Sequence, residues 1–186
     1  MVQATGNSQP KDYINFQQDR ALMQLIGGDQ FLYANTVKKT NMFEWTQERT
    51  LVITDQALYN IHKKKIKRVI SIVEIGGITK TVPPSKNNAE FTVHVPSSYD
   101  YRFITDKREE IIDVIKRAFF VCQKKNVPIF HVTSKDLRDF TTTEKDMKKA
   151  ISRFPLMDMR VIEGEDLFTD GDSQPGEAGK DPQDVD

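Results

Sequence analysis

With 186 residues, 38% of them hydrophobic, and a single cysteine, the chain suits one cytosolic domain with polar tails and cannot hold an internal disulfide framework. Its apolar runs are too short to cross a bilayer, and its N-terminus lacks the basic flank and apolar core of a secretory signal. The formal net charge is zero, but residues 35–86 hold ten Lys/Arg against four Asp/Glu, and residues 158–186 hold two against ten. This contrast of +6 with −8 suggests that the basic middle meets phosphates and that the acidic end could compete for it.

The N-terminal part divides into a polar end and a short amphipathic segment. Residues 1–10 are small and polar, and we expect them to be disordered. Residues 11–28 form the next unit, in which the apolar spacing over residues 12–26 predicts one helix. Its apolar positions are Ile14, Ala21, Leu22, Leu25 and Ile26, and a glycine pair follows them.

From Phe31 onward the hydrophobic period changes from that of a helix to that of strands. Seven strand-like segments follow at close spacing: FLYANTV, ERTLVIT, ALYNIH, KRVISIVEI, GGITKTV, EFTVHV and YRFIT. Asp55-Gln56 has the character of a hairpin turn between the second and third segments. Because the connections are short, antiparallel pairing is the economical topology, and we expect the sheet to close into a barrel or sandwich.

A helix follows the strands, and the barrel with this helix should span residues 29–125. Asp106 and Glu109 have the spacing of a capping box at its start. The apolar stripe of this helix is Ile111, Ile112, Ile115, Ala118, Phe119 and Cys122.

Residues 126–163 form a C-terminal extension, and residues 164–186 form an acidic tail that we expect to be disordered. VPIFHVT is either one further strand or an extended segment. Two short helical stretches are predicted after it, over residues 134–140 and 143–154, the second opened by Thr141 and Glu144 at capping-box spacing.

The order of these parts is that of a pleckstrin-homology-like fold, an α+β but mainly β architecture in which a seven-stranded antiparallel barrel is capped by a C-terminal helix. Three segments carry a closer likeness: VKKTNMFEWTQERTLVITDQALYNI, KIKRVISIVEIGGIT and FTVHVPSSYDYRFITDKREEII. In their shared order they resemble the membrane-binding tail-homology domain of class I myosins, although no motor segment is present. The likeness covers roughly half of the chain, residues 33–120.

The resemblance implies peripheral membrane binding through anionic phosphoinositide headgroups. The residues themselves lead us to expect no catalytic, metal or cofactor site, because no histidine has a cysteine or carboxylate at ligand spacing. Pleckstrin-homology-like modules usually carry a lysine at the end of the first strand, and then a basic residue, any residue and an arginine on the second. Lys38 or Lys39 fits the first position and Arg49 fits the last. The middle position falls on Gln47, so one of the three charges is missing.

The charge pattern supports an anionic-surface site without the resemblance. The loops after the first and third strands of a barrel tend to open at one end, which would bring the cations of both loops to one rim. The candidates for this contact are Lys38, Lys39, Arg49, Lys63, Lys64, Lys65 and Lys67, and the wider set adds Arg68 and Lys86. HKKK at residues 62–65 can equally be a solvated hairpin turn, and KKKIKR could also be a nuclear import signal.

Other residue types give weaker signals. Trp45 stands with Met42 and Phe43 at a predicted loop tip, where it could insert into a bilayer, anchor a partner protein, or fold back on the barrel. The three histidines are far apart, and His94 falls on the polar face of its strand, so we expect it at the surface. Cys122 lies on the apolar stripe, where packing is the expected role.

Two function hypotheses remain open. The first is an adaptor that docks on anionic membrane through the basic rim, in the cytoplasm and linked to the cytoskeleton. The second is a protein-binding structural subunit of a cytoskeletal assembly such as a ciliary axoneme, in which the basic rim would face an acidic protein surface. The missing charge at Gln47 and the length of the C-terminal extension favour the second.

Overall fold

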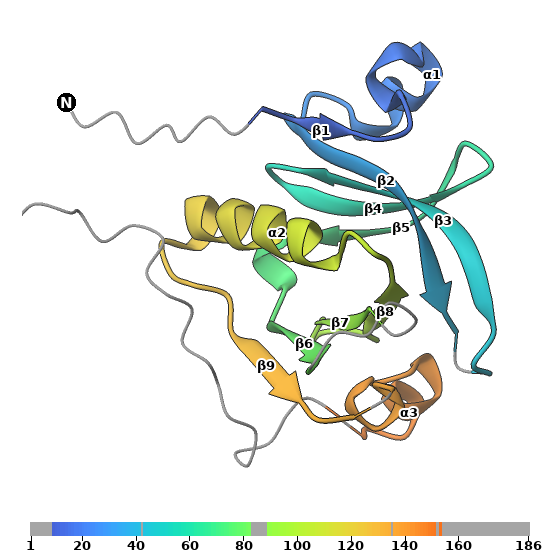
Figure 1. Ribbon diagram of the computed structural model, residues 1–186, viewed down its shortest axis with the longest axis vertical. Helices are drawn as coiled ribbons and strands as arrows, with labels where there is room; N and C mark the ends of the chain where they lie inside the picture. The colour runs from blue at the N-terminus through green and yellow to red at the C-terminus, as the bar shows by residue number, and fades with distance from the viewer. Residues whose placement is uncertain (1–8, 42, 83–88, 135, 152, 154–186) are drawn as a thin grey trace, which may run out of the picture.

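Seven consecutive antiparallel strands form the centre of the fold (Figure 1). The computed structural model describes residues 9–41, 43–82, 89–134, 136–151 and 153. The central strands are β2 (Phe31–Thr40), β3 (Thr46–Thr54), β4 (Ala57–His62), β5 (Lys65–Ser71), β6 (Gly77–Thr81), β7 (Glu90–His94) and β8 (Tyr101–Ile104). Because β2 pairs with both β3 and β8, these strands join into one path in the order β5-β4-β3-β2-β8-β7-β6. All seven predicted strands are present.

Two further strands extend this sheet, and both pair in parallel. β1 (Lys11–Asp12) lies beside β2, and β9 (Ile129–Val132) lies beside β6. The predicted fold class is therefore confirmed as mainly β with a few helices, but the predicted seven-stranded antiparallel barrel is correct only in part. The sheet has nine strands, and its hydrogen-bonded path runs from β5 to β9 without closing on itself. Segments outside the seven strands supply the additional backbone partners.

The capping helix α2 (Arg108–Gln123) packs on the inner face of the sheet, as Figure 1 shows. Its predicted apolar stripe is buried, except that Cys122 is half-buried and its thiol donates to the carbonyl oxygen of Asp55 at 3.3 Å. The predicted capping box with Asp106 does not form. Lys107 is the residue before the helix, and Glu109 instead forms ion pairs with Lys80 and Arg108.

The predicted single helix over residues 12–26 is wrong. In its place lie β1, the 3₁₀ turns η1 (Phe16–Gln18) and η2 (Gln24–Ile26), and the one-turn helix α1 (Arg20–Met23). The Asp12 carboxylate accepts hydrogen bonds from three backbone amides of residues 14–17, and Asn15 has a left-handed φ of 55°, so the helix cannot run through this point. The predicted apolar face is used nonetheless, because Ile26 joins a second core on the outer face of β2, β3 and β4.

The described part of the C-terminal extension, which covers residues 126–134, 136–151 and 153, packs against β6, β7 and the segment before β8. It holds β9, the 3₁₀ turn η4 (Arg138–Phe140) and α3 (Glu144–Lys148). The helix start differs from the prediction, because Thr143 and Asp146 form the capping box in place of Thr141 and Glu144.

The predicted surface position of His94 is wrong. Its side chain is fully buried, with Nδ1 2.9 Å from Asp100 and Nε2 2.6 Å from Thr79. The extension covers this second face of the sheet. The amide of Thr142 donates to Asp100, and the hydroxyls of Thr92 and Thr141 lie 2.9 Å apart.

Several predicted segments lie outside the described residues: most of the polar N-terminus, Met42, the turn that contains Lys86, and the acidic tail. Among the described helices, none is long and apolar enough to cross a membrane.

Candidate functional site

Three cations gather on the inner face of the sheet at the end where β2 stops. We call Lys39, Arg49 and Arg68 the basic cluster. Alternation along a strand places each of them on the side of the core. Lys39 is two residues from Val37, Arg49 two from Leu51, and Arg68 two from Ile70, all three of which are core residues. Strand pairing thus brings together positions that are far apart in the sequence.

Two tyrosines form the floor of the basic cluster. The Arg68 guanidinium carbon lies 3.9 Å from the Tyr99 ring centroid and 4.7 Å from that of Tyr101. Lys39 Nζ lies 4.7 Å from the Tyr101 centroid. Arg68 Nη1 also donates to the Tyr99 carbonyl oxygen at 2.8 Å, so its side chain bridges from β5, at one end of the sheet path, to the segment before β8.

The cations of the cluster repel one another. Burial lowers the pKa of Lys39 below its ordinary value, and the charges of Arg49 and Arg68 lower it further. Burial and the charges of Arg49, Lys63 and Lys67 also lower the pKa of His62, so positive potential continues along the inner edge toward the β4–β5 turn. A bound anion would relieve this repulsion.

Unused hydrogen-bonding atoms lie within the same region. Arg49 Nε and Asn60 Oδ1 are buried and have no hydrogen-bond partner among the described residues. The other Arg49 donors bind Gln47 Oε1 and the Glu48 carbonyl oxygen, and Asn60 Nδ2 binds the Tyr101 hydroxyl at 2.9 Å. Buried polar atoms normally have hydrogen-bond partners, so these two retain hydrogen-bonding capacity that the described residues do not use.

The remaining predicted cations do not join this cluster. Lys38 is exposed and alternates to the other face of β2. Lys63 and Lys64 form the β4–β5 turn, and Lys64 Nζ pairs with Asp19 Oδ2 at 2.6 Å. Lys65 and Lys67 are exposed on β5. In Figure 1 the β4–β5 turn lies near α1 and the β2–β3 loop lies near α3.

The β2–β3 loop holds the predicted aromatic tip. Phe43 is 67% exposed and Trp45 70% exposed, and their ring centroids are 6.3 Å apart. Of the three readings of Trp45, a residue folded back on the barrel does not fit this exposure. Lys39 stands near the end of the strand that leads into this loop.

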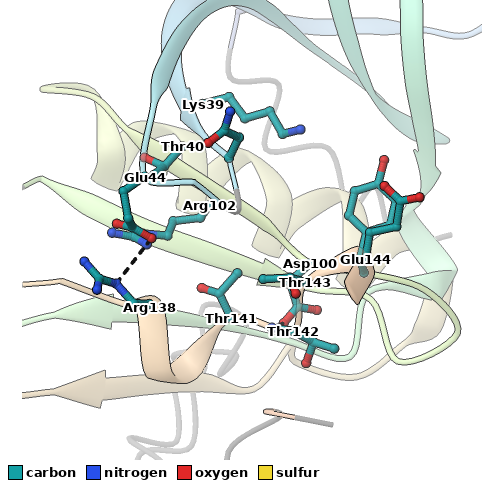
Figure 2. Close-up of a pocket in the computed structure, with 12 residues that line it drawn as sticks. Lys39, Thr40, Glu44, Asp100, Arg102, Arg138, Thr141, Thr142, Thr143 and Glu144 are labelled. Carbon is teal, nitrogen blue, oxygen red and sulfur yellow. Dashed lines mark hydrogen bonds and ion pairs between the residues drawn. The ribbon is translucent and has the colours of Figure 1, made fainter. Parts of the chain in front are cut away.

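A cavity of about 160 Å³ lies between the end of β2, the β2–β3 loop, β8 and the C-terminal extension (Figure 2). Its cations are mostly neutralised. Glu44 Oε1 lies 2.9 Å from Arg102 Nη1 and 3.3 Å from Arg138 Nε, and Glu144 on α3 acts on Lys39 with the opposite charge. This balance makes the cavity a poor anion site by itself.

The described residues contain no cluster of three or more His, Cys, Asp or Glu side chains that could hold a metal ion. His94 and Asp100 are engaged with buried structural partners, and burial raises the pKa of the Cys122 thiol, which disfavours the reactive thiolate.

Sequence reasoning included Arg68 only in the wider set and missed both tyrosines of the cluster. A signal for Arg68 existed, because it precedes Ile70 by two residues in an alternating strand. Nothing comparable pointed to Tyr99, whose position depends on how the β7–β8 connection approaches β5.

Solved structures give only distant likenesses. The hSac2 domain of the human phosphoinositide phosphatase Sac2 is 12% identical, covers 63% of this chain and 87% of its own, and has a TM-score of 0.49. The N-terminal PH domain of human ARAP2 is 14% identical, covers 48% of this chain and 80% of its own, and has a TM-score of 0.40. Scores this low support no statement about fold or function. No curated protein matches the chain significantly.

The family comparison is more informative. Residues 10–152 match the profile of the family described as unconventional myosin tail, actin- and lipid-binding. The match covers well over half of the chain and includes the strands, α2 and most of the described C-terminal extension. It confirms the resemblance seen in the sequence, and the chain belongs to the unconventional myosin tail family.

Proposed function

We propose that the chain is a non-catalytic adaptor that docks on phosphoinositide-containing membrane through the basic cluster and links that membrane to the cytoskeleton. The observation that carries the proposal is the convergence of Lys39, Arg49 and Arg68 on one face, with the Arg49 Nε atom unpaired among the described residues. Each cation near an anionic surface contributes about 1 kcal/mol. The family description, which includes lipid binding, supports the same reading.

The missing basic residue at Gln47 argues less strongly against headgroup binding once Arg68 is considered. Arg68 comes from a different strand but acts on the same lysine, Lys39, as Arg49 does. Three cations are therefore available, two of them guanidinium groups that can bind phosphate through two parallel hydrogen bonds. Phosphate binding would replace mutual repulsion by attraction.

Co-sedimentation with vesicles tests this proposal. The full chain should pellet with phosphatidylcholine vesicles that contain phosphatidylinositol 4,5-bisphosphate, and much less with phosphatidylcholine alone. Arg68→Gln and Lys39→Gln should each weaken the affinity about fivefold, which corresponds to about 1 kcal/mol. Lys125→Gln, an exposed lysine beyond the end of α2, is the matched control and should leave binding unchanged. An equal loss of affinity in all three variants would show that non-specific charge attraction accounts for the binding. If the unaltered chain did not pellet with the vesicles, membrane docking would be refuted.

A second candidate is a structural, protein-binding subunit of a cytoskeletal assembly, such as a complex on axonemal microtubules. It is favoured by the exposed lysines of the β4–β5 turn and β5, which could meet an acidic protein surface, although Lys64 would have to exchange its ion pair with Asp19 for that contact. The family description also includes actin binding. Pelleting with microtubules or actin filaments, lost when Lys63, Lys64 and Lys65 are changed to Glu but retained in Arg68→Gln, would support this candidate over the first.

A further inference from the structure

The described residues of the β2–β3 loop, 41 and 43–45, make several hydrogen bonds with one another although the two aromatic side chains face solvent. Asn41 Oδ1 accepts hydrogen bonds from the amides of Phe43 at 2.9 Å and Trp45 at 3.0 Å. The Asn41 amide donates to the Trp45 carbonyl oxygen, and the Glu44 amide donates to the Asn41 carbonyl oxygen. Glu44 also adopts a left-handed φ of 64°, which is unfavourable for a residue with a side chain. These hydrogen bonds support the conformation in which the Phe43 and Trp45 rings are exposed.

Glu44 connects this loop to the rest of the fold through ion pairs with Arg102 and Arg138, and Figure 2 marks the one with Arg138. One partner, Arg102 on β8, is 6% exposed and is itself held by the buried Glu90. The other partner, Arg138, belongs to the C-terminal extension. Glu90 also accepts the Leu137 amide at 2.8 Å, so the loop, the core and the extension meet in one network.

Two exposed aromatic rings at a loop tip are suited to the interfacial layer of a bilayer, where such rings bury their apolar body beside the headgroups. Cations that could attract the tip to an anionic membrane lie in the same region. Lys39 of the basic cluster stands on the strand that leads to the tip, and α3 and the residue that follows it add the exposed Lys145, Lys148 and Lys149, of which Lys148 pairs with Glu144 at 3.8 Å.

We propose that Phe43 and Trp45 form a wedge that inserts into the interfacial layer of an anionic bilayer, and that the Glu44–Arg138 ion pair lets the C-terminal extension set the position of this wedge. The wedge rests on the membrane docking proposed above, but it adds a second mode of contact to phosphate binding. Glu44 and Arg138 are positioning residues that need not touch lipid. Loss of Arg138 would leave Glu44 with one ion-pair partner, Arg102, which is fixed in the core.

Trp45 is the single tryptophan of the chain, so its fluorescence reports on the wedge without labelling. With vesicles containing phosphatidylinositol 4,5-bisphosphate, its emission should shift to shorter wavelength, and lipids brominated near the headgroup should quench it. Phe43→Ala should lower vesicle affinity about tenfold, the effect of withdrawing one aromatic side chain from an apolar environment. Plain phosphatidylcholine should cause little shift, because no charge would draw the tip to the surface.

Arg138→Gln tests the ion pair, with Arg20→Gln as the matched control on α1, which lies far from the tip in Figure 1. Arg138→Gln should lower the fluorescence anisotropy of Trp45 in the free protein and reduce its blue shift on vesicles, whereas Arg138→Lys, which keeps the charge, should restore both in part. Thermal unfolding and far-ultraviolet circular dichroism show whether each variant is folded.

The possible outcomes separate the two proposals. If the chain pellets with vesicles but Trp45 emission does not move, the wedge is wrong and headgroup docking stands. If Trp45 shifts equally in Arg138→Gln and Arg20→Gln, insertion stands and the control by the extension is wrong. If the chain does not pellet and Trp45 does not shift, both proposals fail. A shift of Trp45 that appears only with a purified protein partner and never with vesicles would overturn the choice of a bilayer.

Discussion

Gln47→Lys should strengthen membrane binding, and a gain is more decisive than a loss because partial unfolding cannot produce it. Gln47 lies on the inner face of β3, two residues before Arg49, and pairs in register with Lys39 on β2. Its side chain is exposed and accepts one hydrogen bond from Arg49. A lysine there would add one charge beside the basic cluster, worth about 1 kcal/mol at an anionic surface, or about a fivefold gain in affinity.

The gain will be reduced by the lost hydrogen bond to Arg49 and by added repulsion of Lys39, so fivefold is an upper value. Affinity should be measured by co-sedimentation with phosphoinositide vesicles at two salt concentrations, and the gain should shrink at the higher one because salt screens exposed charges. Gln56→Lys in the β3–β4 turn, at the other end of these strands, adds the same charge away from the cluster and is the matched control. Unchanged or weaker binding of Gln47→Lys at low salt, with the fold intact, would refute the placement of the phosphate site.

Three further predictions concern the scaffold. Lys63→Gly should raise the free energy of unfolding by up to about 1 kcal/mol in denaturant titrations, because Lys63 has a left-handed φ of 50° that glycine adopts without strain; no gain would show that the turn is relaxed. Gly77→Ala should cost about 1–3 kcal/mol and speed amide hydrogen exchange in β9, because an added Cβ would lie 2.8 Å from Phe130 Cε2; unchanged exchange would contradict the tight β6–β9 contact. Burial would raise the pKa of Asp146, but hydrogen bonds at the start of α3 and from Arg153 lower this pKa from 3.8 to about 2. The ionised Asp146 therefore contributes its full stabilisation above pH 4, and this stabilisation is lost as pH falls through 2. Amide exchange in α3 should therefore accelerate across that range in the unaltered chain and much less in Asp146→Asn.

Local patterns were sufficient to predict the seven central strands and the capping helix. In the predicted strand KRVISIVEI, Val69 and Val73 are exposed while Ile70 and Ile72 are buried, as the alternation requires, although the strand β5 ends at Ser71 and the 3₁₀ turn η3 (Ile72–Glu74) follows it. The apolar stripe of α2 likewise follows from its period alone. These features depend on residues a few positions apart, and the sequence displays that spacing directly.

The N-terminal segment shows where such a pattern misleads. Its apolar spacing matched a helix, but the Asp12 side chain competes for the amides that a helix would use, and Asp19 starts a new turn by accepting from Ala21 and Leu22. Periodicity reports which residues are buried, and here burial was predicted better than conformation.

The site could be predicted only in part, because its third cation comes from long-range pairing. Lys39 and Arg49 are diagonal neighbours across one hairpin, because Lys39 pairs with Gln47 and Arg49 pairs with Val37, and this proximity can be predicted from the strand register. Arg68 reaches them only because β5 curves toward the segment before β8, where Tyr99 and Tyr101 receive its guanidinium group. Such a contact depends on the twist of the whole sheet, which no short pattern records.

The C-terminal extension accounts both for the wrong prediction of His94 and for one of the two ion pairs of Glu44. β7 was predicted to have one solvent-exposed face, yet every residue of this strand is buried. The extension supplies β9 at the edge of the same sheet and polar partners for Glu90 and Thr92. The same extension carries Arg138 to the β2–β3 loop. The family match also runs through it, to residue 152. We therefore propose that the unit that folds and binds continues past the expected boundary at residue 125. Without the extension, the buried polar side chains of β7 would be exposed to water, and Glu44 in the β2–β3 loop would lose its ion pair with Arg138.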